Sequence, residues 1–290
     1  MQPDDERAAI AALGRVLGPD VLAAVQALYR PEQDRLAALQ PASVVDLAYG
    51  SDPRQALDLY APGPREARLP VLLWVHGGGF MRGEKWSAEH PFNAHAGRWA
   101  ARNGMLGAVM NYRLAPGATW PAGGEDVASA VALLRAYAGR HGGDPDRIVV
   151  AGTSAGAVHI ATALRLRPDL AIRGAVLLSG LYGFTPLDDR DTLYYGDADL
   201  YPERMPREAM IATGLPLLLA CAEFDPPRFQ RETLGLLAAR LDWHAAMPRA
   251  YIASGHNHFS LAYHLGGRDT RLADEMLGFI ADVCGAGESE

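Results

Sequence analysis

Val150-Ala151-Gly152-Thr153-Ser154-Ala155-Gly156 is an apolar, strand-like run that ends in Gly-x-Ser-x-Gly and leads directly into a helical stretch. The two glycines lack side chains, so the strand and the helix can approach closely. The serine between them takes a strained backbone that presents its hydroxyl above a sheet. The N-terminus of the following helix stabilises negative charge nearby. The motif indicates a nucleophilic serine; the alternative is a glycine-lined turn with an incidental serine.

On either side of this turn, strand-like and helical stretches alternate along the chain. We predict strands at 71–75, 105–110, 147–150, 174–178, 215–222 and 250–253, and helices at 89–102, 126–140, 155–166, 228–241 and 271–283. A hairpin of strands at 43–47 and 57–60 precedes them. Apolar strands separated by helices indicate a mostly parallel sheet that is covered on both faces. Ligands bind beyond the carboxyl ends of such strands, so the residues after each strand are the functional candidates.

A second glycine motif, His76-Gly77-Gly78-Gly79-Phe80, directly follows the predicted strand at 71–75. Consecutive glycines leave their backbone N–H groups unobstructed, and such donors stabilise the oxyanion that develops in acyl transfer. The alternatives are a flexible turn and a phosphate-binding loop. The sequence lacks the P-loop pattern, and the first strand-to-helix turn lacks the dinucleotide-binding pattern. Two glycine motifs at the ends of different strands therefore favour acyl transfer.

A serine nucleophile also needs a histidine to take its proton and a carboxylate to orient that histidine. In folds of this kind the chain order is serine, acid, histidine. Asp225, within Glu223-Phe224-Asp225-Pro226-Pro227, stands directly after the predicted strand at 215–222 and is the predicted acid. Glu223 is the second choice, and a role in a turn or helix cap is the structural alternative for Asp225.

Two histidines follow the next strand, in Ser254-Gly255-His256-Asn257-His258-Phe259. We predict that His258 is the general base, with His256 as the alternative. His159 lies on the helix after the serine, where packing or contact with a lid is the expected role. No His-Glu-x-x-His motif or carboxylate cluster accompanies the histidine pair, so no metal site is predicted.

Seven segments together resemble the α/β-hydrolase superfamily, specifically the hormone-sensitive-lipase-like carboxylesterases and the related small esterases and aryl formamidases. The segments appear in the family's order and cover roughly residues 70–265. They are His76-Gly77-Gly78-Gly79-Phe80, Asn111-Tyr112-Arg113-Leu114-Ala115-Pro116, Trp120-Pro121-Ala122, Asp144-Pro145-Asp146-Arg147-Ile148, Gly152-Thr153-Ser154-Ala155-Gly156, Asp225-Pro226 and His258-Phe259.

This resemblance implies an α/β-hydrolase fold with a small helical cap. It implies Ser154 as nucleophile, Asp225 as acid and His258 as base, with an oxyanion hole formed by the N–H groups of Gly78, Gly79 and Ala155. Two features depart from the lipase-like branch. Thr153 stands where that branch usually has an acid, and the separation between Ser154 and Asp225 is short, which implies a reduced cap. Both favour the smaller esterases and formamidases, and a long-chain lipase is not predicted.

The predicted function is hydrolysis of carboxylic esters of small or medium acyl chain through an acyl-enzyme, with no metal or organic cofactor. One alternative is an aryl formamidase or amidase that uses the same triad. Another is a non-catalytic small-molecule receptor on the hydrolase scaffold, which the complete set of triad positions disfavours. Phe80, Trp86 and the aromatic insert, with Phe184 and Tyr195, are the predicted walls of an acyl or alcohol pocket, with ordinary core as their alternative.

Composition excludes several other classes of function. The 290 residues carry a net charge of −7, so neither nucleic acid nor an anionic membrane is an expected partner. No apolar run approaches the ~18–20 residues that cross a bilayer. The acidic start Met1–Glu6 lacks the features of a signal peptide, so a cytoplasmic location is expected. The two cysteines, Cys221 and Cys284, lie far apart and predict no disulfide framework.

We divide the chain into an N-terminal helical segment, 1–40, and a hydrolase domain, 41–290. The first segment contains two amphipathic helices, the first of which is expected to end at Gly18. Both are expected to pack over the site as part of a cap, with a homodimer interface as the alternative. Within the domain, residues 181–213 are rich in tyrosine and too long for an ordinary strand-to-helix connection. Their aromatic content predicts a lid.

Overall fold

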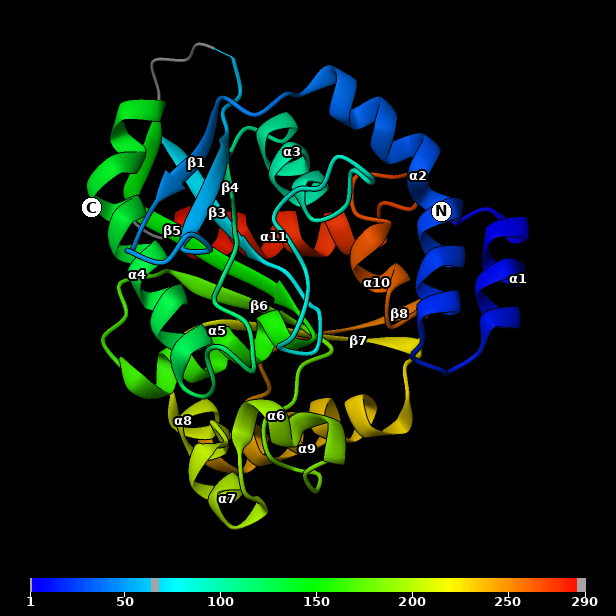
Figure 1. The fold of residues 1–290 in the computed structure, drawn as a ribbon, viewed down its shortest axis with the longest axis vertical. Coiled ribbons are helices and arrows are strands. Elements are labelled where there is room, and N and C mark those ends of the chain that lie inside the picture. Colours follow the sequence, from blue (N-terminus) through cyan, green and yellow to red (C-terminus); the bar gives the residue numbers. More distant parts are fainter. Residues whose placement is uncertain (1, 64–67, 286–290) are drawn as a thin grey trace.

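Residues 2–63 and 68–285 are described by a computed structural model, whose centre is one eight-stranded sheet (Figure 1). The strand order is β1-β2-β4-β3-β5-β6-β7-β8. The six neighbouring strands β4, β3, β5, β6, β7 and β8 run parallel to one another. The β1–β2 hairpin extends the sheet through β2, which pairs with β4 in antiparallel orientation. The predicted fold class is confirmed. The strands are β1 Val44–Ala48, β2 Ala56–Tyr60, β3 Leu69–Val75, β4 Leu106–Met110, β5 Gly143–Thr153, β6 Gly174–Leu178, β7 Leu217–Phe224 and β8 Arg249–Asn257.

Helices cover both faces of this sheet (Figure 1). One hydrophobic core joins the sheet to α4, α5, α8 and α9, and a second joins its opposite face to α3, α10 and α11. The helices are α1 Asp4–Leu13, α2 Pro19–Leu39, α3 Ala94–Arg102, α4 Ala122–Tyr137, α5 Ala155–Leu166, α6 Thr192–Tyr195, α7 Tyr201–Arg204, α8 Arg207–Ala212, α9 Pro227–His244, α10 Ser260–Tyr263 and α11 Arg271–Gly285. Among the described residues, none of them combines the length and apolar character that crossing a membrane requires.

Strand β3 shows why these apolar runs form a doubly covered sheet. Val71, Leu73 and Val75 point into the core beneath α4 and α5, whereas Leu72 and Trp74 point into the core beneath α3 and α11. Side chains alternate between the two faces of a strand, so only a continuous apolar run can bury both faces. All five side chains are at most 1% exposed. The sheet therefore supplies a rigid base for the residues that follow its strands.

Three predicted helix boundaries are wrong by four residues or more, and one of them is the start of α4, at Ala122 instead of 126. The first N-terminal helix ends at Leu13 instead of continuing to Gly18, because Gly14 takes a positive φ of 65° and leaves the helical path. Gly18 precedes α2 as its N-cap. The helix predicted from residue 89 begins only at Ala94, after Asn93, whose φ is 66°. In the other two places one residue in the left-handed region sets the boundary.

Figure 1 shows α1 and the adjoining part of α2 beyond the ends of β7 and β8, and α6, α7 and α8 of the insert 181–213 below α5 and beside α9. The insert is broken into α6, α7, α8 and two short 3-10 turns. The side chain of Gln2, which precedes α1, donates to the carbonyl of Gly255 in β8 at 3.1 Å. Leu17, between α1 and α2, packs against a hydrophobic cluster to which the insert contributes Tyr194, Tyr195 and Tyr201. Segments distant in sequence therefore meet over the same edge of the sheet.

Candidate active site

Ser154 occupies a sharp turn between β5 and α5. Its φ of 53° lies in the left-handed region, and the residue is partly exposed. A Cβ on Gly156 would lie 2.1 Å from the carbonyl oxygen of Val75, and one on Gly152 would lie 2.8 Å from Ile160 Cδ1. Neither position therefore accepts a larger residue without displacement of its surroundings. The spacing of Gly-x-Ser-x-Gly is thus a steric requirement of this turn.

The glycine motif after β3 lies beside this serine. A Cβ on Gly77 would come within 3.3 Å of Ser154 Cβ, and one on Gly78 would lie 1.9 Å from the carbonyl oxygen of Arg82. Gly78 and Gly79 have positive φ angles of 134° and 59°. Within the described part of the chain, no group accepts a hydrogen bond from the N–H of Gly78, Gly79 or Ala155. These predicted oxyanion donors are therefore available to a ligand.

Asp225 and His258 are brought together from the ends of β7 and β8. His258 Nδ1 lies 2.7 Å from Asp225 Oδ1, and the carboxylate is fully buried. The other carboxylate oxygen accepts from the backbone N–H of Ala222 at 2.7 Å and from the hydroxyl of Ser179 at 2.5 Å. With Nδ1 turned to the carboxylate, Nε2 is the ring nitrogen that remains for proton transfer. The Phe229 ring packs on this imidazole, with 4.2 Å between ring centroids.

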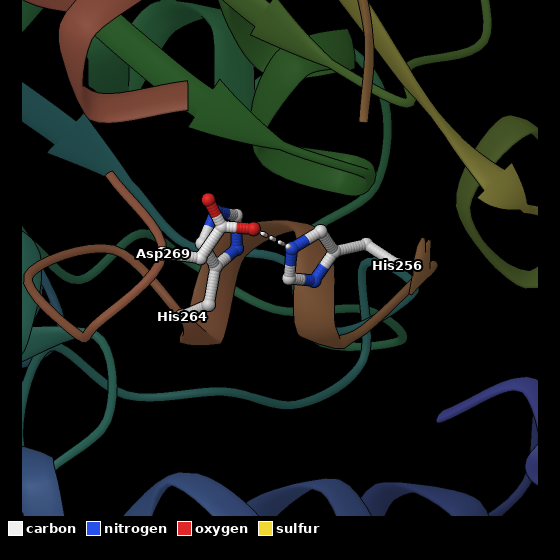
Figure 2. Close-up of side chains that lie close together, drawn as sticks. All are labelled: His256, His264 and Asp269. Atoms are coloured by element: carbon white, nitrogen blue, oxygen red, sulfur yellow. Dashed lines mark hydrogen bonds and ion pairs between the residues drawn. The ribbon is translucent and has the colours of Figure 1, made fainter. Parts of the chain in front are cut away.

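The two second-choice residues point elsewhere. The carboxylate of Glu223 accepts from the Gly255 N–H at 2.7 Å and from the Ser254 hydroxyl at 2.9 Å. These two hydrogen bonds lower the pKa of Glu223. His256 faces Asp269, with Nε2 3.2 Å from the nearer carboxylate oxygen (Figure 2). Glu223 therefore holds Ser254 and Gly255 of β8, and His256 links the end of β8 to Ser260 and Asp269.

His256, His264 and Asp269 form a buried cluster whose donor atoms lie within 4.8 Å of one another (Figure 2). The two imidazoles stack with 3.8 Å between their centroids, and burial lowers the pKa of His264 to about 3. Burial raises the pKa of Asp269, but hydrogen bonds from Arg271 and His256 outweigh it and hold that pKa below its usual range. The guanidinium of Arg271 already neutralises this carboxylate and would repel a cation. We interpret the cluster as a clamp on the β8–α10 segment.

An aromatic cluster adjoins the serine, formed by Phe80, Tyr194, Tyr195, Tyr201 and Phe229 together with Ala155 and Val158. The Phe80 ring stacks on Tyr194 with 4.3 Å between centroids, and Tyr195 meets Phe80 edge to face at 5.5 Å. Tyr194 also lies 3.3 Å from His159 Nδ1, so this histidine contacts the insert.

The four predicted wall residues thus divide into two pairs. Phe80 and Tyr195 are almost completely buried in the aromatic cluster. Phe184 instead packs over Gly235 of α9, beneath the Arg207 guanidinium. Trp86 is 47% exposed and is not a member of the cluster.

Sequence reasoning missed Ser179 and Arg15. Ser179 follows β6 directly, so the rule that selected the other candidates also applies to it. Arg15 lies between α1 and α2 and donates to the carbonyl oxygen of Asp225 at 3.0 Å. No local pattern in the sequence signals that contact, because it depends on how the N-terminal helices dock.

The sheet order, with its strained serine turn after β5 and the histidine–aspartate pair after the last two strands, is that of the α/β-hydrolase fold. Comparison with known proteins agrees with this class. Residues 57–169 match the family model described as BD-FAE. The chain is 31% identical over 206 residues to the probable carboxylic ester hydrolase LipM of Mycobacterium tuberculosis, covering 62% of this chain and 47% of that protein. It is 26% identical over 276 residues to esterase LipQ of the same organism, covering 84% and 63%.

Solved structures show the same fold over nearly the whole chain. A bacterial heroin esterase superposes with a TM-score of 0.70 at 25% identity, covering 97% of this chain and 98% of that one. Esterase LipW from Mycobacterium marinum superposes with a TM-score of 0.71 at 19% identity, covering 99% of each. The predicted resemblance to α/β-hydrolase esterases is confirmed. The chain spans less than two thirds of the length of either curated relative named above.

Proposed function

We propose that this chain is a serine carboxylesterase that hydrolyses esters of small or medium carboxylic acids through an acyl-enzyme. The observation that carries the proposal is the 2.7 Å contact between His258 Nδ1 and Asp225 Oδ1 at the sheet edge that also presents Ser154 on its strained turn. Ser154 is assigned as nucleophile, His258 as general base and Asp225 as the carboxylate that orients it. The names of the relatives support an ester as substrate.

In the first half of the reaction, Ser154 Oγ attacks the ester carbonyl carbon while His258 Nε2 takes its proton. The carbonyl oxygen becomes an oxyanion and accepts hydrogen bonds from the free N–H groups of Gly78, Gly79 and Ala155. The bond to the alcohol oxygen then breaks, and His258 returns the proton to that leaving group. Asp225 stays ionised and stabilises the imidazolium.

In the second half, water replaces the alcohol. His258 takes a proton from the water, its oxygen attacks the acyl carbon, and the tetrahedral species again rests on the same three N–H groups. The bond to Ser154 Oγ breaks and the serine recovers its proton, which releases the carboxylic acid. The residues of this chain supply every proton acceptor and donor that these steps need.

The aromatic cluster supports small acyl groups. Phe80, Tyr194 and Tyr195 are each at most 3% exposed and contact one another in the cluster that contains Ala155, so large aromatic rings are packed close to the serine turn. We assign Phe80 and Tyr195 to the acyl pocket. The positions of Trp86 and Phe184 give no support for the same assignment.

We further propose that residues 1–40 act with the insert 181–213 as the cap of a hydrolase domain that comprises 41–290. Arg15 binds the Asp225 carbonyl, and Leu17 packs against the aromatic cluster. Deleting residues 1–38 and comparing activity with size on gel filtration tests the cap against a homodimer interface. Loss of activity without a change of size supports the cap.

The central test is turnover of p-nitrophenyl acetate and butyrate by the purified chain and its Ser154→Ala variant. Removing the nucleophile should lower kcat by roughly 10⁴-fold or more. A Ser154→Ala protein with unchanged turnover contradicts the proposal. Reaction of the wild type with a fluorophosphonate probe, absent in the variant, locates the nucleophile independently and distinguishes an enzyme from an inert receptor.

Matched pairs test the remaining assignments. Asp225→Asn should lower kcat by about 10⁴-fold because the amide favours the wrong tautomer of the histidine, whereas Glu223→Gln should retain turnover. His258→Gln should abolish turnover, and His256→Gln should retain it in the folded fraction. Parallel rates on a formyl aryl amide and on short esters decide between esterase and formamidase activity.

A further inference from the structure

Ser179 has an unusual backbone at the junction between β6 and the insert. Its φ is 48°, a left-handed value that is rare for a residue other than glycine, and its side chain is fully buried. Ser154 and Phe80, which also follow strands at this edge, share such positive φ angles. Residues in this region carry strain of order 1–3 kcal/mol, which persists only where the surroundings demand that conformation. Their grouping at one edge of the sheet points to a functional reason.

One peptide unit places Ser179 between the proposed nucleophile and the proposed acid. The carbonyl oxygen of Leu178 accepts from the N–H of Ser154 at 2.8 Å, and the N–H of Ser179 donates to the carbonyl of Ala220 in β7, also at 2.8 Å. Strand β6 lies between β5 and β7, so its end contacts both neighbouring turns. The left-handed φ then aims the Ser179 side chain at Asp225.

The hydroxyl completes the hydrogen bonding of the Asp225 carboxylate. An ionised carboxylate only accepts, so Ser179 Oγ donates to Oδ2 across 2.5 Å. The Ala222 N–H donates to the same oxygen at 2.7 Å, while Oδ1 faces His258 Nδ1. With Oδ2 held by two donors, rotation of the carboxylate is restricted and Oδ1 keeps its alignment with the imidazole.

We propose that Ser179 is a positioning residue for the reaction: its hydroxyl fixes the Asp225 carboxylate and thereby orients His258. This inference rests on the proposed esterase function. Ser179 does not touch the reacting atoms, so it acts through Asp225 alone. Its loss leaves Ala222 N–H as the single donor on Oδ2 and frees the carboxylate to turn.

Loss of the hydroxyl also changes the electrostatics around the base. The hydroxyl presents the positive end of its dipole to the carboxylate, so removing it strengthens the negative potential at His258 and favours the imidazolium. The acidic limb of the pH profile of kcat/KM should therefore move to higher pH. Other titratable or charged groups near the pair are Arg15, on the Asp225 carbonyl, Glu223, which is turned toward Gly255 and paired with Arg7, and the Cys221 thiol, whose pKa is raised by burial and by the Asp225 carboxylate. None of these residues is altered in a Ser179 variant.

Two substitutions separate a role of the hydroxyl from a role of the backbone. Ser179→Gly removes the hydroxyl and relieves the positive φ, whereas Ser179→Ala removes the hydroxyl and keeps the strain. If Ser179 served only to make the turn, glycine would behave like the wild type. The proposal expects both variants to lose about tenfold in kcat on p-nitrophenyl acetate, with the acidic limb displaced in the same direction.

The experiment compares Ser179→Ala, Ser179→Gly and a matched control, Ser43→Ala, whose hydroxyl donates to the carbonyl of Leu59 far from the site. Titration with a fluorophosphonate probe counts competent molecules, so a poorly folded fraction does not imitate a slower enzyme. In an Asp225→Ala background, Ser179→Ala should change kcat by less than about twofold, because no oxygen remains on residue 225 for the hydroxyl to bind.

Several outcomes would overturn the inference. A glycine variant with wild-type kcat and an unmoved acidic limb, or a full tenfold effect of Ser179→Ala in the Asp225→Ala background, would contradict it. Failure of the esterase proposal itself looks different. In that case Ser154→Ala retains turnover, or the wild type hydrolyses none of the esters, irrespective of residue 179.

Discussion

Glu232 on α9 binds the first residues of the insert. Replacing it with glutamine measures how much this contact contributes to the free energy of unfolding. Its carboxylate accepts from the N–H groups of Tyr182, Gly183, Phe184 and Thr185 at 2.7–3.1 Å, and from the Thr185 hydroxyl. The side chain is fully buried. Five donors therefore converge on one carboxylate, and a neutral side chain of the same shape cannot satisfy all of them.

The magnitude follows from this geometry. A glutamine offers one acceptor oxygen and one NH₂ group in place of two carboxylate oxygens. In its best orientation the NH₂ group donates to the Thr185 hydroxyl and leaves the Thr185 N–H unpaired, which costs about 1–3 kcal/mol. The other hydrogen bonds lose their charge assistance, roughly 1 kcal/mol each. The easier burial of a neutral amide offsets part of this. Glu232→Gln should therefore lower the free energy of unfolding by about 2–4 kcal/mol.

Calorimetry and hydrogen exchange measure the effect. At an unfolding entropy of about 2.1 cal/mol/K per residue, the loss lowers Tm by roughly 3–7 °C in a chain of this size. Amide exchange at residues 182–185 should accelerate. Glu208→Gln, an exposed acid on the same insert, is the matched control and should stay within about 0.5 kcal/mol. If Glu232→Gln also changed the free energy of unfolding by less than about 0.5 kcal/mol, and amide exchange at 182–185 were unchanged, the reasoning would be refuted.

Three further predictions concern other parts of the molecule. Lys85→Met should lower the free energy of unfolding by about 3–5 kcal/mol, because Asp58, 2.6 Å from Lys85 Nζ, stays buried without its charged partner. Urea unfolding should show that the double variant Lys85→Met with Asp58→Leu recovers stability. Burial lowers the pKa of His159 to about 3 from the usual 6.5, so the unfolded chain takes up the proton first. The contribution of this residue to stability is then fully present above pH 6.5 and is lost between pH 6.5 and about 3, by about 1.4 kcal/mol per pH unit, and His159→Gln should reduce the dependence of Tm on pH correspondingly. Tyr195→Ala should open the acyl pocket and raise the rate on p-nitrophenyl octanoate relative to acetate by about tenfold, as a chain-length series of esters would show.

Residues that directly follow strands were predictable from the sequence. Ser154 and Asp225 each follow a buried apolar run, and His258 follows shortly after the next one. Parallel strands bring their carboxyl ends to one edge. The fold class followed from the same alternation of strands and helices. The rule would also have selected Ser179, which stands immediately after β6. A local pattern is sufficient in these cases because the sheet itself performs the long-range assembly.

The direction of a side chain outside regular structure was not predictable in the same way. Trp86 lies close to the glycine motif in the sequence and Phe184 lies in the aromatic insert, yet Trp86 is half-exposed and Phe184 packs over Gly235. The end of the first helix is set by the glycine that takes a positive φ. Both Gly14 and Gly18 can take one, so the sequence does not decide between them. The contact of Arg15 with Asp225 required two helices to dock across the whole chain.

Helix α9 connects the insert to the proposed base. Arg228 pairs with Asp191 of the insert at 2.7 Å, Phe229 packs against the His258 ring, and Glu232 holds the start of the insert. These three residues lie within about one helical turn. The same rigid helix therefore supports both the insert and the Phe229 ring that packs against His258. Substitutions in the insert that leave α9 in place should therefore alter KM and substrate preference alone. Substitutions that displace α9 also move the Phe229 ring that packs against the His258 imidazole. They should therefore lower kcat as well as alter KM.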